Sequence, residues 1–334
     1  MDQADWLAQV NETVLEPGLP ICDPHHHLWD HPNSRYLLDE LLLDTGSGHN
    51  VVSTVFVECA SMYRADGPEA MKPVGETEFV NGVAAMSASG RYGPIRAAAG
   101  IVSLADLTLG EQVGEVLDAH MAVGARFKGI RHAAGWDASP DVRNSHTNPT
   151  QGMLLDKTFR KGFRELDKRG LSFDAWLYHP QITEVTDLAR AVPEATIVLD
   201  HLGGPLGIGR YAGHRDEILA QWRIDIAELA TCPNVNVKVG GIGMVTYGLG
   251  FEDRPTPPTS DDLVAAWGGP ITYTIEQFGA ERCMFESNFP VDKMSCSYVT
   301  LWNAFKLVAA GASPAEKAAL FHDTAARVYK VEAG

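Results

Sequence analysis

The distribution of apolar positions along the chain predicts eight β-strands separated by polar or helical sequence. Several of the runs are apolar almost throughout, as is typical of strands that are buried on both faces of a sheet. Many of them end in a group of polar residues. The predicted strands cover residues 20–28, 51–60, 95–104, 125–133, 171–179, 195–203, 234–242 and 282–290.

The segments between these runs carry helical periodicity. Residues 111–123 place Val113, Val116, Leu117 and Met121 at the spacing of one helical face. Apolar spacing or capping residues predict further helices over 156–170 and 180–193 and from 314 onward.

Strands that alternate with helices predict a parallel sheet of the α/β class, and eight of them predict a closed (β/α)8 barrel of the TIM type. An open doubly wound sheet is the alternative, but no glycine-rich dinucleotide turn follows the first strand. We expect one domain over residues 20–334, preceded by an N-terminal extension over residues 1–19. Long loops at the carboxyl face of the barrel are predicted at 134–153 and 243–270.

Composition narrows the classes of function. A net charge of −16 argues against a nucleic-acid partner, because phosphate binding needs a clustered positive surface. The chain has no apolar run of about 18 residues and no basic-then-apolar leader, so neither a membrane span nor a signal peptide is expected. Its five cysteines lack a CxxC pair, which favours free thiols in a reducing compartment. A cytoplasmic enzyme for a small molecule is the expectation, and a homo-oligomer is the common default.

Polar residues gather where the predicted strands end. In a barrel of this kind, the carboxyl ends of the strands carry the chemistry. The candidates from these positions are His25, His27, Glu58, Lys128, Arg131, His132, His179, Asp200, His201, Glu286, Asn288 and Asp292.

Strand alternation separates the three consecutive histidines of the first strand. His25 and His27 lie on one side of the strand, and His26 faces the other way. Two neutral imidazoles aimed at one point are typical of a metal site. A single His-x-His is more often structural, but His179 and His201 also end predicted strands and strengthen the prediction. These four histidines are the metal-ligand candidates.

The remaining candidates predict substrate binding. Lys128 and Arg131 would place positive charge at the entrance of the barrel in an otherwise acidic protein, which favours an anionic or carbonyl-bearing ligand. Both side chains could equally pair with carboxylates. Glu58 could orient a histidine or contact the substrate. Three aromatic or imidazole side chains complete the predicted substrate-binding set: Trp29, His132 and His179.

Three motifs resemble the amidohydrolase superfamily. They are D-x-H-x-H-x-W at 23–29, IVLDHLGGP at 197–205 and RCMFESNFPVD at 282–292. The ending FHDTAARVYKV at 321–331 is similar to the last helix of the amidohydrolase-related, lactonase-like group. That group includes hydrolases of sugar-acid lactones, of 2-pyrone-4,6-dicarboxylate and of sulfomuconolactone.

The resemblance implies a distorted amidohydrolase-like barrel that opens a cyclic ester or, in some members, releases carbon dioxide. By motif match, His25 and His27 take the ligand places of strand one, His201 takes that of strand six, and His179 stands near that of strand five. A divalent ion, with zinc the first choice, is therefore expected. Members of the group differ in whether they need a metal, so a metal-independent mechanism stays open.

The sequence departs from the group at the end of strand eight. The group usually has an aspartate in a Ser-Asp-Trp-Pro-like context, whereas this chain has Asn288. An aspartate accepts a proton from water and an amide does not. Either Asn288 only positions water or substrate, or a nearby carboxylate, Glu286 or Asp292, takes the role of base.

The leading hypothesis is hydrolysis of a lactone or related cyclic ester by activated water, with Asn288, Asp292, Glu286 and His201 as the catalytic candidates. A serine nucleophile is not expected, because the chain has no Gly-x-Ser-x-Gly elbow. Metal-dependent non-oxidative decarboxylation is one alternative. A barrel that binds a lactone or carboxylic acid without turnover is another, favoured by Asn288. Specificity is expected in the loops at 61–75, 134–153 and 243–270.

Overall fold

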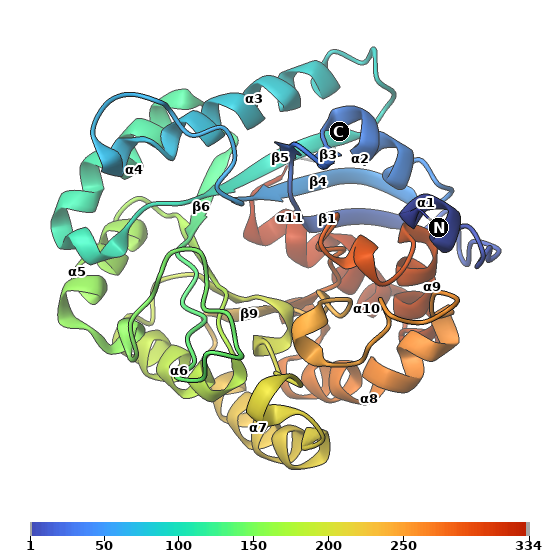
Figure 1. Ribbon diagram of the computed structural model, residues 1–334. Coiled ribbons are helices and arrows are strands. Elements are labelled where there is room, and N and C mark those ends of the chain that lie inside the picture. The colour runs from blue at the N-terminus through green and yellow to red at the C-terminus, as the bar shows by residue number, and fades with distance from the viewer. Residues whose placement is uncertain (1, 332–334) are drawn as a thin grey trace.

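The computed structural model describes residues 2–331 and confirms the predicted barrel (Figure 1). Eight strands form one sheet in chain order, and every hydrogen-bonded pair in it is parallel. Each strand overlaps its predicted range. The strands are β1 (Pro20–His26), β4 (Asn50–Val57), β5 (Arg96–Ser103), β6 (Phe127–Arg131), β7 (Ser172–Ala175), β8 (Ile197–Leu199), β9 (Val235–Lys238) and β10 (Cys283–Met284).

The two edge strands of the sheet meet just beyond the end of β10. The backbone N–H of His27 donates to Phe289 O over 2.8 Å, and the N–H of Asn288 donates to His25 O over 2.8 Å. His26 and Phe289 form an isolated parallel bridge. These bonds close the cylinder at its carboxyl end and bring strand one beside strand eight.

Helices surround the barrel, as Figure 1 shows. The described helices are α1 (Gln3–Leu7), α2 (Leu38–Thr45), α3 (Val74–Ala88), α4 (Val113–Val123), α5 (Lys157–Asp167), α6 (Ile182–Ala191), α7 (Arg215–Ala230), α8 (Ser260–Phe278), α9 (Tyr298–Val308), α10 (Pro314–Ala318) and α11 (Thr324–Val328).

The prediction of one long loop over 243–270 was wrong in its second half. Helix α8 begins at Ser260, because the Thr259 side chain accepts the N–H of Asp262 and caps the first turn. The run of prolines before this point hides the cap in the sequence. A two-stranded antiparallel hairpin, β2 (Trp29–His31) with β3 (Ser34–Tyr36), was not predicted either.

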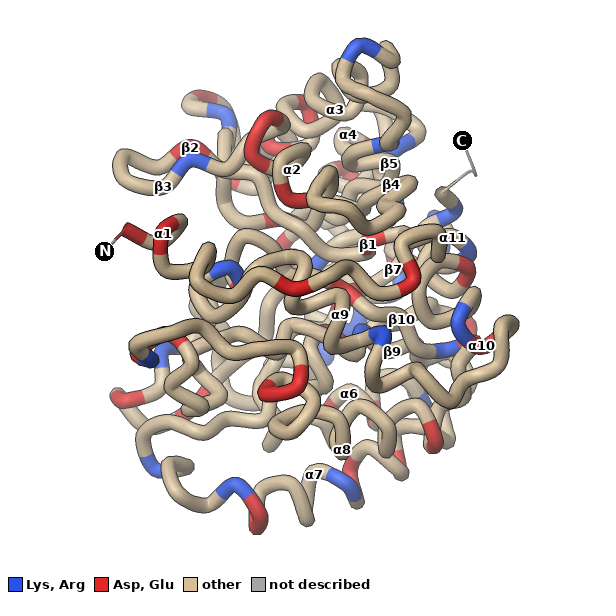
Figure 2. The backbone as a smooth tube through the Cα atoms, turned by 90° about the vertical axis from the view of Figure 1, so that its right-hand side faces the viewer, with Lys and Arg blue, Asp and Glu red and all other residues tan. Residues whose placement is uncertain are grey.

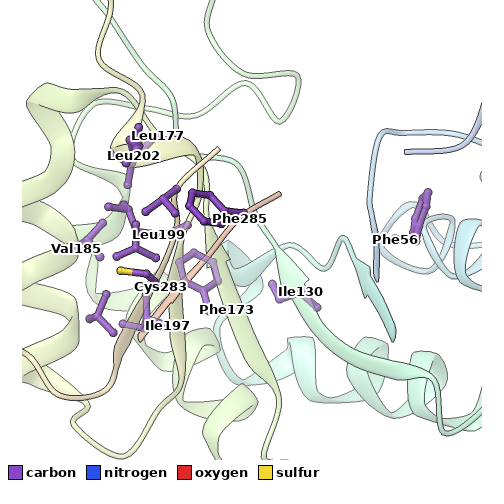
Figure 3. Close-up of a cluster of buried hydrophobic side chains, with 14 of the residues drawn as sticks. Phe56, Ile130, Phe173, Leu177, Val185, Ile197, Leu199, Leu202, Cys283 and Phe285 are labelled. Atoms are coloured by element: carbon purple, nitrogen blue, oxygen red, sulfur yellow. The ribbon is translucent and has the colours of Figure 1, made fainter. Parts of the chain in front are cut away.

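Apolar side chains fill the layer between strands and helices. Phe173 of β7 contacts Phe159 and Phe163 of α5, with ring centroids 6.0 and 5.4 Å apart. Figure 3 shows Phe173 and Ile197 in this layer, with Val185 of α6 nearby. Burial of such side chains is the main favourable term in folding, and it fixes which face of each strand points into the barrel.

The amino-terminal end of the barrel is closed by the last helix. Val328 and Tyr329 pack against the inward-facing Val55 and Val57 of β4. Lys330 Nζ donates to Gly170 O, directly before β7, over 3.0 Å. The polar centre of the barrel therefore lies above an apolar floor, at the carboxyl end.

The N-terminal segment before β1 is attached to the barrel. The Trp6 indole N–H donates to Arg254 O over 2.9 Å, and Lys306 Nζ donates to Leu15 O over 2.8 Å. Figure 2 shows acidic and basic residues interspersed on the side that carries α1, β2 and β3. Met1 and residues 332–334, at the ends of the two predicted ranges, lie outside the described residues.

The five cysteines are all free thiols. Within residues 2–331, no helix combines the length and the apolar character that crossing a bilayer requires.

Candidate active site

His25 is at the centre of a buried polar cluster at the carboxyl end of the strands. Its Nδ1 lies 2.9 Å from Glu286 Oε2, and its Nε2 lies 3.3 Å from an Nη of Arg131. The rings of His25 and His201 are 4.5 Å apart between centroids. All four side chains are almost fully buried. The side chains at the carboxyl ends of β1, β6, β8 and β10 therefore lie together.

His201 and Glu286 form a hydrogen-bonded dyad. His201 Nδ1 lies 2.6 Å from Glu286 Oε1. The backbone of His201 is in the left-handed region, at φ 54°, a conformation that costs energy for a non-glycine residue. Gly241 allows the close approach, because a Cβ there would lie 2.2 Å from His201 Nδ1. When Glu286 is ionised its Oε1 can only accept, so the dyad then fixes Nδ1 as the proton-bearing nitrogen of the neutral ring and leaves Nε2 as a proton acceptor.

His27 and Asn288 present two acceptor atoms to each other. His27 Nδ1 lies 2.8 Å from Val57 O, which can only accept, so Nδ1 carries the proton. Asn288 Nδ2 donates to Asp292 Oδ1 over 2.8 Å, which turns Asn288 Oδ1 toward His27 Nε2 at 3.3 Å. Two lone pairs at this distance suit a donor that reaches both, such as a water molecule. Asp292 also accepts from Gly243 N over 2.7 Å, so both its oxygens serve to position the Asn288 amide.

Arg131 is held by Glu58. Its Nε donates to Glu58 Oε1 over 2.8 Å, and one Nη donates to the Glu58 carbonyl over 2.5 Å. The other Nη faces His25 and lies 3.8 Å from Asp200 Oδ2. His146, from the long loop after β6, contacts Glu58 Oε2 at 3.0 Å and is about one-third exposed. Glu58 therefore fixes the guanidinium, with one edge directed at the centre.

Lys238 is a central residue that the sequence analysis missed. Its Nζ lies 2.6 Å from Asp174 Oδ2, 3.0 Å from Asp200 Oδ1 and 3.1 Å from His25 Nδ1. Tyr329 donates to Asp174 Oδ2 over 2.7 Å from the floor of the barrel. The available signal was a lysine inside the otherwise strand-like NVNVKV, and an aspartate inside LSFDAW.

Burial dominates the pKa values of the centre. It lowers the pKa of both His27 and His201 to about 3 and that of His25 well below its ordinary value. It raises the pKa of Glu286 to about 8. Burial also opposes the charge of Lys238, but the neighbouring carboxylates outweigh it and raise its pKa. The imidazoles are therefore neutral at pH 7, and the ammonium is charged.

Three predicted site residues lie away from this cluster. His179 lies in a short 3₁₀ turn that follows β7, and not on the strand itself. Its Nδ1 accepts the N–H of Leu206. His132 faces outward from β6, where its Nδ1 accepts the N–H of Leu107. Lys128 lines a cavity of about 210 Å³ beside Lys330 and Gly170, at the amino-terminal end of the barrel. These three residues do not join the cluster, because strand ends and bulges decide which side chains converge, and the apolar runs of the sequence do not show them.

Trp29 and His26 lie where the sequence placed them relative to the barrel interior. Trp29 stacks on His27, with centroids 6.0 Å apart, and so lies at the edge of the centre. His26 points out of the barrel interior, where its Nε2 is 2.8 Å from Thr54 Oγ1 and its ring lies against Phe56.

Residues 22–331 match the model of the Amidohydrolase family. The chain belongs to this family. It is 34% identical to an uncharacterized protein of Sinorhizobium fredii, over 94% of this chain and 99% of the relative. It is 28% identical to an L-fucono-1,5-lactonase of Burkholderia multivorans, over 62% of this chain and 64% of the relative. A zinc-bound amidohydrolase structure from Burkholderia multivorans superimposes with a TM-score of 0.71 at 23% identity, over 93% of this chain and 99% of that one. The amidohydrolase resemblance and the barrel predicted from the sequence are both confirmed.

Part of the amidohydrolase centre fits a divalent ion. Ligand atoms of His25, Asp200 and His201 lie within 4.8 Å of one another, and all three residues are buried. Both imidazoles are neutral, and the Asp200 oxygens make no aligned hydrogen bond among the described residues, although Lys238 Nζ lies 3.0 Å from Oδ1. Of the four predicted ligands, His25 and His201 belong to this group, whereas His27 and His179 do not. Asp200, which had no assigned role, replaces them.

Proposed function

We propose that the chain is a hydrolase that opens a lactone or related cyclic ester by attack of water. The observation that carries the proposal is the His201–Glu286 dyad, 2.6 Å long and fully buried, beside the anchored guanidinium of Arg131. A base oriented by a carboxyl group next to a fixed cation is what ester hydrolysis needs. The lactonase relative supports the same reaction class.

In this mechanism His201 acts as the general base. Water lies between its Nε2 and the acceptor pair formed by His27 Nε2 and Asn288 Oδ1. As the oxygen attacks the carbonyl carbon, His201 takes one proton, and Glu286 holds the ring through Nδ1. Asn288 orients the water and accepts no proton, which accounts for an amide at this position. Asp292 fixes the direction of that amide.

Arg131 stabilises the negative charge that develops on the carbonyl oxygen. Its Nε and one Nη are occupied by Glu58, so the remaining Nη is preorganised toward the centre. When the ring C–O bond breaks, His201 returns its proton to the leaving oxygen, and the product is a hydroxy acid. Trp29, stacked on His27, supplies an apolar wall for the substrate.

A divalent ion, when bound, would be held by His25, Asp200 and His201 and would supply Lewis acidity and a more acidic water, but it would take the Nε2 of His201 and so replace that residue's role as base. Zinc is the ion that a mixed set of imidazole and carboxylate ligands favours.

The test is a pH-indicator screen of sugar lactones and muconolactones, with and without added zinc. His201→Asn should abolish acid release. The control, His120→Asn, replaces another buried histidine that lies on α4 and contacts Thr77, and it should leave turnover intact. Carbon dioxide release from an unsaturated acid, with no lactone opened, would replace the proposal with decarboxylation. A thermal shift without any product would leave a ligand-binding barrel.

A further inference from the structure

The ammonium of Lys238 lies in a ring of groups that normally surround a metal ion. Two carboxylates, Asp174 and Asp200, and one imidazole, His25, lie within 3.1 Å of its Nζ. Lys238 is fully buried at the end of β9, and the Tyr329 ring is 5.4 Å from its Nζ. Carboxylate and imidazole are also the donors that divalent ions take in proteins.

Two of these three groups are shared with the possible ion site. His25 and Asp200 both belong to the group whose ligand atoms converge with that of His201. An ion bound there would lie beside the ammonium and use the same Asp200 carboxylate. Like charges at such separations repel strongly in a buried site, where water screens them poorly.

Asp200 depends on nearby cations for its compensation. Its oxygens make no aligned hydrogen bond among the described residues, although the residue is fully buried. The charges nearest to it are Lys238 Nζ at 3.0 Å and an Nη of Arg131 at 3.8 Å. Because a buried carboxylate is costly without a counter-charge, removing the ammonium leaves an unfilled cation position.

We propose that the Lys238 ammonium is the resident cation of this centre: held by Asp174, Asp200 and His25, it supplies the positive charge that a divalent ion on His25, Asp200 and His201 would otherwise supply. The native chain therefore binds divalent ions weakly at this centre, and loss of the ammonium opens a tight site. The inference concerns the same centre as the proposed hydrolysis, but its test does not depend on turnover.

The experiment is a calorimetric titration of chelator-stripped protein with Co²⁺, with the visible absorption of the bound ion as a second readout. Lys238→Met should bind Co²⁺ at least about a hundredfold more tightly than the native chain, since one positive charge beside the site is removed. Adding Asp200→Asn to Lys238→Met should abolish the gain. Lys306→Met, a change of another buried lysine that contacts Leu15 O and His49, should leave the affinity unchanged.

Two measurements guard against failure of the single variant to fold. Asp174→Asn with Lys238→Met removes both partners of an ion pair together and keeps the net charge, so it should fold and show the same gain. The native chain alone also decides, because tight stoichiometric Co²⁺ binding with Lys238 in place would overturn the proposal. A folded variant with native-like weak affinity would overturn it as well. Both results leave lactone hydrolysis untouched.

Discussion

The ion pair between Glu58 and Arg131 gives a prediction that needs no knowledge of the substrate. The pair is buried, with 0% and 8% side-chain exposure, and its Nε–Oε1 distance is 2.8 Å. Glu58→Gln removes the negative partner and leaves a buried guanidinium partly uncompensated, which typically costs about 3–5 kcal/mol. For 334 residues at about 2.1 cal/mol/K per residue, the unfolding entropy is about 0.7 kcal/mol/K. The melting temperature should therefore fall by about 4–7 °C.

The assay is thermal denaturation of the native chain, Glu58→Gln, Arg131→Met and the double variant. The double variant should lose less stability than the sum of the two single changes, because the second change no longer leaves a charge unpaired. Glu228→Gln is the matched control, since it breaks the exposed pair with Arg190 at 3.0 Å, and it should cost less than about 1 kcal/mol. If Glu58→Gln melts together with that control, the guanidinium is not held by Glu58 and its catalytic placement fails.

Three further predictions concern the centre. Glu286→Gln should lower kcat by about 10²–10⁴-fold, because an amide can also donate to His201 Nδ1 and no longer fixes the tautomer; an unchanged kcat in steady-state kinetics on a lactone would contradict it. Lys128→Met should keep kcat/KM within about twofold of the native value, because the side chain lies at the opposite end of the barrel, and a large loss would place Lys128 back in the site. The melting temperature should also fall as the pH drops from about 6.5 to about 4.5. Buried histidines have folded pKa values near 3 or 4, below their unfolded value, so the unfolded chain takes up their protons first and their contribution is lost on acidification. Carboxyl groups with a raised pKa act against the six histidines named below, because their contribution is lost as the pH rises: Glu76 and Glu286, both raised to about 8, and Asp23, Glu184, Asp200, Asp225 and Asp292. A melting temperature that rises on acidification would show that these carboxyls outweigh the histidines. The six histidines are His26, His27, His49, His120, His179 and His201.

The sequence by itself determined the order and number of the strands and, through them, the closed barrel. Apolar runs that alternate with helical periodicity have few ways to bury both faces of a sheet, and the eight runs predicted here overlap the eight strands of the barrel. Alternation along β1 was enough to place His25 inside and His26 outside, because the side-chain period of a strand is fixed by its backbone.

Only the tertiary structure decided which polar ends meet. Lys128 and Arg131 are three positions apart on one strand, yet they lie toward opposite ends of the barrel. Lys128 is near the start of β6, next to a register shift in the pairing of β5 with β6, whereas Arg131 is the last residue of the strand. Likewise, His179 lies beyond its strand, whereas Asp174, inside it, reaches Lys238. Lys238 was not among the predicted site residues, because the carboxylates that compensate its charge come from other strands. Local sequence fixes the direction of a side chain, but its partners depend on strand register and barrel closure.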